Sequence, residues 1–140
     1  MGFPMTLEDF VRQNARLFSL GDVAGSAAHV DVPMTARVAG SNFAANALED
    51  VVFALTIFRQ NLLVESFQSL DVTEFYATEP VNGKAQAFVR YQITNDTGGA
   101  IDTFDATFIC RQTDEGGWAV CEAESLPPAK DRFLQGIPLA

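Results

Sequence analysis

Two stretches decide the fold: 71-DVTEFYATEPVNGKAQAFVRYQIT-94 and 101-IDTFDATFICRQTDEGGWAVCEAES-125. In each, two runs of alternating apolar and polar residues flank a short turn, Asn82-Gly83 in the first and Glu115-Gly116 in the second. Alternation is typical of strands with one buried face, and such turns tolerate the positive φ angles that tight hairpins need. The two stretches therefore predict two antiparallel hairpins in one strongly curved sheet.

The first half of the chain is mainly helical in pattern. A capping sequence at Thr6 precedes apolar residues at helical spacing, and Gly21 is a natural helix end. The expected class is α+β, with one domain over 1–140, a core over about 5–125 and an irregular tail over 126–140. The expected order is α-α-β-α-β-β-β-β, with helices over about 6–20, 22–30 and 46–64 and strands over about 34–39, 68–79, 85–94, 101–112 and 118–125.

Composition and charge exclude several classes of partner. The 140 residues are 48% hydrophobic and carry a net charge of −9, so anionic nucleic acids and anionic membranes are not expected partners. No run approaches the roughly 20 apolar residues that span a bilayer. The N-terminus lacks the basic and apolar regions of a secretory signal, so a cytoplasmic location is expected.

The two cysteines lie on the two arms of the second hairpin. With Glu115-Gly116 as the loop, Cys110 is expected directly opposite Cys121. Two buried thiols are the usual state in a protein without a secretion signal, and a cross-strand disulfide is the alternative. Neither cysteine has a neighbour at metal-ligand spacing, so no metal site and no cofactor are expected.

Four local sequences carry a resemblance to a known family. They are Leu20-Gly21-Asp22, His29-Val30-Asp31-Val32-Pro33, Phe58-Arg59-Gln60-Asn61-Leu62 and Gly117-Trp118-Ala119-Val120. With the element order, they resemble the NTF2-like superfamily, which includes ketosteroid isomerase, scytalone dehydratase and the SnoaL-like cyclases. The resemblance implies a cone-shaped fold, a ligand held between the concave sheet face and the helices, and a homodimer.

Strand alternation predicts which residues line that concave face. In the first hairpin it places Glu74, Tyr76, Val89 and Tyr91 inward, and in the second Phe104, Phe108, Ala119 and Cys121. An apolar wall with a few polar groups is typical of a small-molecule site. The predicted ligand-binding residues are therefore Tyr76, Val89, Phe104, Phe108, Ala119 and Cys121.

Three residues are candidates for acid–base chemistry. A carboxylate held away from water, here Glu74, suits proton transfer, and the Tyr91 phenol could donate to a developing oxyanion, as in ketosteroid isomerase. His29 lies near the end of the second helix, which borders the pocket in the family. The alternative is that Glu74 sits in water at the rim, the tyrosines are core residues and His29 lies on the surface.

Two functions follow from this pattern. The first is binding of a small apolar molecule, with cofactor-independent isomerisation, cyclisation or dehydration as the chemistry if the protein is an enzyme. The second is a non-catalytic module that dimerises and binds a protein partner. An open cavity favours the first function, whereas a cone filled by the twelve phenylalanines favours the second.

Overall fold

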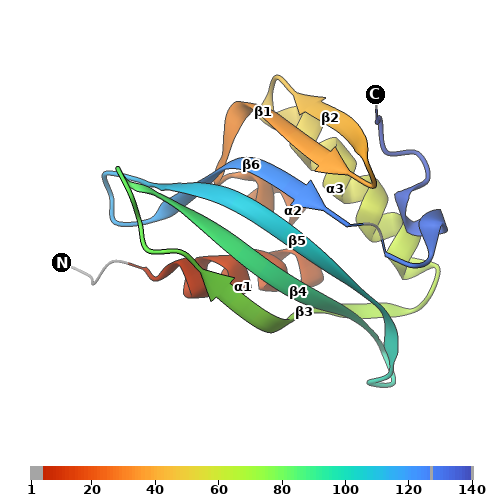
Figure 1. Cartoon of the computed structure of the whole chain (residues 1–140). Coiled ribbons are helices and arrows are strands. Elements are labelled where there is room, and N and C mark those ends of the chain that lie inside the picture. The colour runs from red at the N-terminus through yellow and green to blue at the C-terminus, as the bar shows by residue number, and fades with distance from the viewer. Residues whose placement is uncertain (1–4, 127, 140) are drawn as a thin grey trace.

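A computed structural model describes residues 5–126 and 128–139 and confirms the α+β class. One six-stranded sheet, in the order β2-β1-β6-β5-β4-β3, curves over the helices (Figure 1). β1 and β6 are parallel, and every other neighbouring pair is antiparallel. The elements are α1 Leu7–Ser19, α2 Val23–Ala27, β1 Val30–Val38, β2 Ser41–Ala45, α3 Leu48–Leu63, β3 Phe67–Ala77, β4 Lys84–Asn95, β5 Ala100–Gln112, β6 Trp118–Ser125 and the 3₁₀ helix η1 Asp131–Leu134.

The expected order is correct except that it lacks β2. Ala39 and Gly40 adopt positive φ angles of 54° and 79°, and this tight turn folds β2 back on β1 with Val38 opposite Ser41. β2 has a single large apolar residue, Phe43, so its alternation is weak in the sequence. The turn is a hairpin connection rather than the end of a lone strand.

The helix α1 begins and packs as its sequence predicts. The Thr6 hydroxyl accepts a hydrogen bond from the Asp9 backbone N–H at 3.1 Å, which caps the first turn. At the other end, the Arg59 guanidinium of α3 donates to the backbone carbonyls of Phe18 and Ser19 at 2.9 and 3.1 Å. Arg59 thereby satisfies carbonyl groups that have no partner inside the helix and ties α3 to α1.

The α3 helix is less buried than its apolar sequence predicts. Only Val51 and Leu62 are fully buried, and Phe53 is 55% exposed. The side of α3 on which Phe53 lies is therefore open to solvent.

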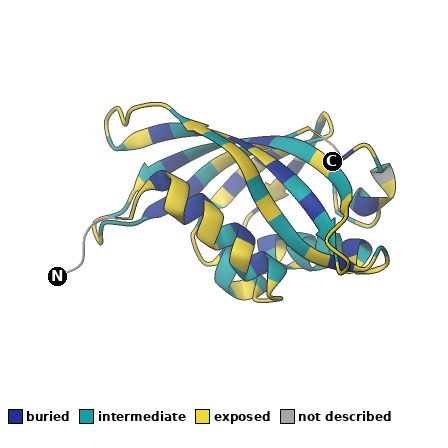
Figure 2. Cartoon of the chain, turned by 90° about the horizontal axis from the view of Figure 1, so that it is seen from below, coloured by how far each residue is buried: buried dark blue, intermediate teal, exposed yellow. Residues whose placement is uncertain are grey.

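β-bulges change which residues face inward. The register between β3 and β4 shifts between Phe67 and Ser69 and again between Val72 and Glu74, and the register between β5 and β6 shifts between Ile109 and Cys110. Buried and exposed residues alternate along the strands on either side of these shifts (Figure 2). Because side chains alternate with a period of two, one extra residue moves every following side chain to the other face.

The C-terminal segment, residues 128–139, packs against the body of the protein. Phe133 is fully buried in a cluster with Phe18, Leu62, Phe67 and Ile93. The Asn61 side-chain amide of α3 donates to the carbonyls of Phe133 and Gln135 at 3.0 and 2.8 Å. The tail expected to be irregular therefore contains a 3₁₀ turn and is anchored along α3, as Figure 1 shows.

Within residues 5–126 and 128–139, no helix has the length and apolar character needed to cross a membrane. The same residues contain no cluster of His, Cys, Asp and Glu side chains that could hold a metal ion.

Candidate functional site

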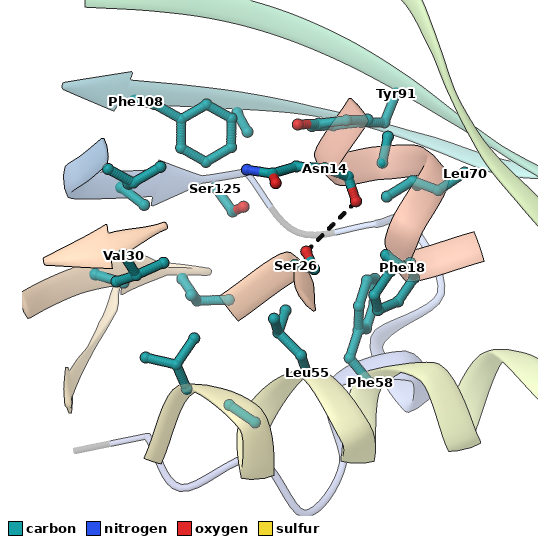
Figure 3. Close-up of a pocket in the computed structure, with 18 of the residues that line it drawn as sticks. Asn14, Phe18, Ser26, Val30, Leu55, Phe58, Leu70, Tyr91, Phe108 and Ser125 are labelled. Atoms are coloured by element: carbon teal, nitrogen blue, oxygen red, sulfur yellow. Dashed lines mark hydrogen bonds between the residues drawn. The ribbon is translucent and has the colours of Figure 1, made fainter. Parts of the chain in front are cut away.

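A cavity of about 260 Å³ lies between the concave face of the sheet and the helices (Figure 3). Every helix and strand contributes at least one residue to its wall, and the C-terminal segment contributes Pro128, Leu134 and Ile137. The phenylalanines therefore do not fill the interior, although six of them line the cavity: Phe10, Phe18, Phe43, Phe58, Phe104 and Phe108.

Aromatic rings form a continuous wall on one side of the cavity. Phe18 stacks on Phe58 with ring centroids 5.7 Å apart, and Phe58 and Phe104 form a T-shaped pair with centroids 6.1 Å apart. Phe104 in turn stacks on Tyr91 at 5.1 Å. A flat ring of a ligand can pack against both the faces and the edges of these aromatic side chains.

Tyr91 lies in the middle of β4, between Val72 of β3 and Phe104 of β5. Its side chain is directed into the cavity and the residue is only 7% exposed. Burial raises the pKa of Tyr91 well above the ordinary value of 10.0. The hydroxyl therefore stays protonated at neutral pH and can donate a hydrogen bond to a ligand.

Asn14 is the polar residue of the α1 wall. Asn14 lies four residues after Phe10 and four residues before Phe18. Because residues four apart lie on the same side of a helix, Asn14 is on the buried, apolar side of α1. Its Oδ1 atom is buried and has no hydrogen-bond partner among the described residues. A buried acceptor without a partner costs about 1–3 kcal/mol, so such groups are rare unless they serve a purpose.

The remaining polar residues of the wall are Ser26 and Ser125. The Ser26 hydroxyl donates to the Asn14 backbone carbonyl at 3.4 Å, the contact drawn in Figure 3. That contact connects α2 to α1 and leaves the Asn14 side-chain amide free to meet a ligand. No charged residue belongs to the described wall.

No protein-family model matches the chain, and no curated protein matches it by sequence. Solved structures do match it. An NTF2-like protein with a cystatin-like fold from Novosphingobium aromaticivorans has a TM-score of 0.68 at 14% identity, over 84% of this chain and 77% of that one. An NTF-2 like protein from Shewanella oneidensis has a TM-score of 0.65 at 13% identity, over 86% of this chain and 95% of that one. The chain has the NTF2-like fold.

A third structure with this fold comes from Catenulispora acidiphila and is a complex with S-DNPA. It is similar at a TM-score of 0.68 and 14% identity, over 86% of this chain and 89% of that one. At these identities the likeness shows the NTF2-like fold and the curled sheet, and the residues of the cavity must be judged from this chain alone.

Glu74 does not face the NTF2-like cavity, so its expected position is wrong. β3 has one extra residue between Ala77 and the Val81–Lys84 bridge at the turn, so Ala77 pairs with Ala87 and Glu74 lies on the outer face of the sheet, opposite Arg90. There the Glu74 carboxylate lies 3.3 Å from the Arg90 guanidinium, and its side chain is 68% exposed. A carboxylate in water beside an arginine is a surface ion pair rather than a group held away from solvent.

Tyr76 follows Glu74 to the outer face for the same reason. It is 67% exposed and its ring lies 5.9 Å from that of Phe88. It is therefore not part of the cavity wall, contrary to the expectation from alternation.

The second hairpin turns one residue out of the expected register, with Gln112 opposite Trp118, and this displaces two further residues. Cys121 is the extra residue of the β6 bulge, because Cys110 pairs with Val120 and Ile109 pairs with Glu122. The Cys121 thiol instead contacts the Asp31 carboxylate at 3.6 Å, and Ala119 is buried outside the cavity wall. The residues of β6 that line the cavity are Val120, Ala123 and Ser125.

Both cysteines are free thiols, so the cross-strand disulfide considered as the alternative is not formed in the structure. Burial raises the pKa of the Cys110 thiol to about 12. Cys110 is therefore a protonated, unreactive core residue at neutral pH.

The other predicted residues divide between cavity, core and surface. Phe104 and Phe108 line the cavity as expected, with Tyr91. Val89 is buried at 3% exposure but packs in the core without lining the cavity. His29 is exposed in the turn before β1, where its ring meets the edge of Phe10 at 5.8 Å, so the structure does not bring it to the cavity.

Charged groups collect on the outer face of the sheet. Arg90 donates to Asp105 at 2.8 Å, and this hydrogen bond lowers the pKa of Asp105. Arg111 forms a two-pronged pair with Asp31, one hydrogen bond being 2.9 Å long, and this pairing lowers the pKa of Asp31. Across the strands, Arg111 lies opposite Ala119 of β6.

The protonation of Tyr91 can be tested with the Tyr76→Phe variant, which keeps Tyr91 as its only tyrosine. Burial raises the pKa of Tyr91 in the folded state by disfavouring the tyrosinate, so the folded protein should lose stability as the pH rises above 10. We expect tyrosinate absorbance to appear above pH 10 together with alkaline unfolding measured by circular dichroism. Ionisation near pH 10 in a protein that stays folded would show that water reaches the hydroxyl.

Proposed function

We propose that this chain binds a small, mainly apolar molecule in the cavity between the sheet and the helices. The observation that carries the proposal is an open cavity of about 260 Å³ whose wall is apolar except for four uncharged polar residues. An engineered apolar cavity of about 150 Å³ stays dry and binds benzene. By that scale, this cavity fits a molecule of roughly ten non-hydrogen atoms.

The wall favours binding over catalysis. Isomerisation, cyclisation and dehydration each need a proton acceptor within hydrogen-bond reach of the substrate. The described wall contains no Asp, Glu, His or Lys, and its single ionisable group, Tyr91, is held in the protonated form. The proposal is therefore a binding protein, and no reaction is assigned to it. A protein from Catenulispora acidiphila with the same fold forms a complex with S-DNPA. This complex supports the proposal that the present chain binds a small molecule.

Naphthalene is a suitable test compound because it is apolar, uncharged and close to the size of the cavity. At a free concentration ten times its dissociation constant, it should stabilise the fold by about 1.4 kcal/mol and raise the melting temperature by a few degrees, on the order of 5 °C. The measurement is thermal unfolding with increasing naphthalene. A melting temperature that does not change up to the solubility limit would contradict the proposal.

A second candidate function is association through the outer face of the sheet. Tyr76 and Phe88 lie side by side there and are 67% and 41% exposed. Exposed aromatic pairs are enriched at protein interfaces. Homodimer formation through this face is thus a further proposal, and sedimentation analysis of the wild type against Phe88→Arg tests it: a wild-type monomer at all concentrations would exclude it. A cytoplasmic location stays a prediction.

A further inference from the structure

The polar groups of the cavity are few and directional. The Asn14 Oδ1 atom has no partner among the described residues, and the Tyr91 hydroxyl is directed into the same cavity (Figure 3). Asn14 belongs to α1 beneath the sheet, whereas Tyr91 belongs to β4 in the sheet itself. A ligand in the cavity therefore meets an acceptor on α1 and a donor on β4.

The charge of the ligand is restricted by the same wall. Moving a carboxylate or an ammonium group from water into an apolar site is strongly unfavourable unless a partner of opposite charge is present. The described wall has no charged residue, and the ion pairs of Arg90 and Arg111 lie on the outer face of the sheet. A charged molecule of the right size would lose its hydration and gain no ion pair.

We propose that the natural ligand is an uncharged ring compound that carries a hydroxyl group, and that Asn14 and Tyr91 select it through that group. This inference rests on the proposed function, because it names the class of molecule held in the same cavity.

A hydroxyl group fits both polar residues. It can donate its proton to Asn14 Oδ1 and accept a hydrogen bond from the Tyr91 hydroxyl, which burial keeps protonated. The Phe18–Phe58–Phe104–Tyr91 wall provides ring faces and edges for the rest of the molecule. A purely apolar ligand would leave the Asn14 acceptor without a partner, and the protein would gain less from binding it.

The experiment compares three compounds that share one ring system: naphthalene, 2-naphthol and 2-naphthoate. They present the cavity with no polar group, an uncharged hydroxyl and a charged carboxylate. Dissociation constants are measured at neutral pH by fluorescence titration, with competition for the weaker compounds. We expect 2-naphthol to bind about fivefold to tenfold more tightly than naphthalene, since one net hydrogen bond has about that effect. Binding of 2-naphthoate should be undetectable.

Two variants assign the preference to residues. In Asn14→Leu, 2-naphthol should lose its advantage over naphthalene while naphthalene binds at least as well. This variant should also melt at a higher temperature than the wild type, because it removes a buried acceptor without a partner. Tyr91→Phe should reduce the advantage of 2-naphthol as well. The matched controls are Gln13→Leu, which is exposed on the same helix, and Tyr76→Phe, which removes the exposed tyrosine hydroxyl.

The outcomes separate this inference from the proposed function. Equal binding of naphthalene and 2-naphthol, or a preference that survives Asn14→Leu and Tyr91→Phe, overturns the inference but leaves the cavity as a binding site. Binding of 2-naphthoate as tight as that of 2-naphthol also overturns the inference alone. If neither naphthalene nor 2-naphthol binds, the proposed function fails and this inference fails with it.

Discussion

Replacing Ala106 by phenylalanine (Ala106→Phe) should weaken the binding of 2-naphthol by about 100-fold or more while the protein stays folded. Ala106 lies at the centre of β5 between Val89 and Ser125, and it is part of the cavity wall. A ring needs a space on the order of 150 Å³, so a phenyl group on this residue takes more than half of the cavity. The space left is too small for a second ring. Titration with 2-naphthol measures the loss.

The matched control for this variant is Ala44→Phe. Ala44 is exposed on β2 and does not line the cavity, so the same added ring should leave binding unchanged. Chemical denaturation of both variants checks that each remains folded, since overpacking of a core costs about 1–3 kcal/mol. Wild-type affinity in Ala106→Phe would mean that the ligand binds elsewhere.

Phe133→Ala should lower the free energy of unfolding by about 3–5 kcal/mol, the usual loss when a fully buried phenylalanine is truncated. Phe133 has no exposed surface and joins the C-terminal segment to Phe18, Leu62, Phe67 and Ile93. Its loss should also weaken 2-naphthol binding, because Leu134 and Ile137 of the same segment line the cavity. Denaturant unfolding monitored by circular dichroism measures the first effect.

The control for Phe133→Ala is Leu126→Ala, since Leu126 is 59% exposed and should change the free energy of unfolding by no more than about 0.5 kcal/mol. If Phe133→Ala were to unfold outright, Phe133→Leu keeps the comparison measurable. A loss below about 1 kcal/mol in Phe133→Ala would contradict a C-terminal segment that is part of the core.

The fold was predictable because its main signals are local. Turn residues and alternation locate the two hairpins, and capping and helical spacing locate α1. The β2 strand was not predicted because Phe43 is its single large apolar residue. In the sequence, the turn at Ala39-Gly40 is therefore indistinguishable from the end of a strand. The exposure of Phe53 on α3 was not predictable, because the sequence of a helix that is apolar on most sides does not show which sides other elements cover.

The cavity wall was predictable only where strand pairing is regular. Tyr91, Phe104 and Phe108 were placed correctly because β4 and most of β5 keep one register. Glu74 and Tyr76 were misplaced because β3 has one extra residue between Ala77 and Val81, and this residue reverses the faces counted from the Asn82-Gly83 turn. Cys121 was misplaced in the same way, because the turn of the second hairpin places Gln112 opposite Trp118 and Cys110 opposite Val120.

Asn14 was missed although the sequence contains a signal for it. It occupies an apolar position of α1 between Phe10 and Phe18, where the helical pattern calls for an apolar residue. A polar residue on the buried side of an amphipathic helix indicates either a satisfied core group or a ligand contact. Its unpartnered Oδ1 atom in the structure favours the second.

The most direct test of the account is a crystal structure of the protein grown with 2-naphthol. We expect electron density for two fused rings inside the cavity, beside Phe58 and Phe104, with the ligand hydroxyl within hydrogen-bond distance of Asn14 Oδ1. A cavity that stays empty, or a ligand bound only on the outer face of the sheet, would contradict it.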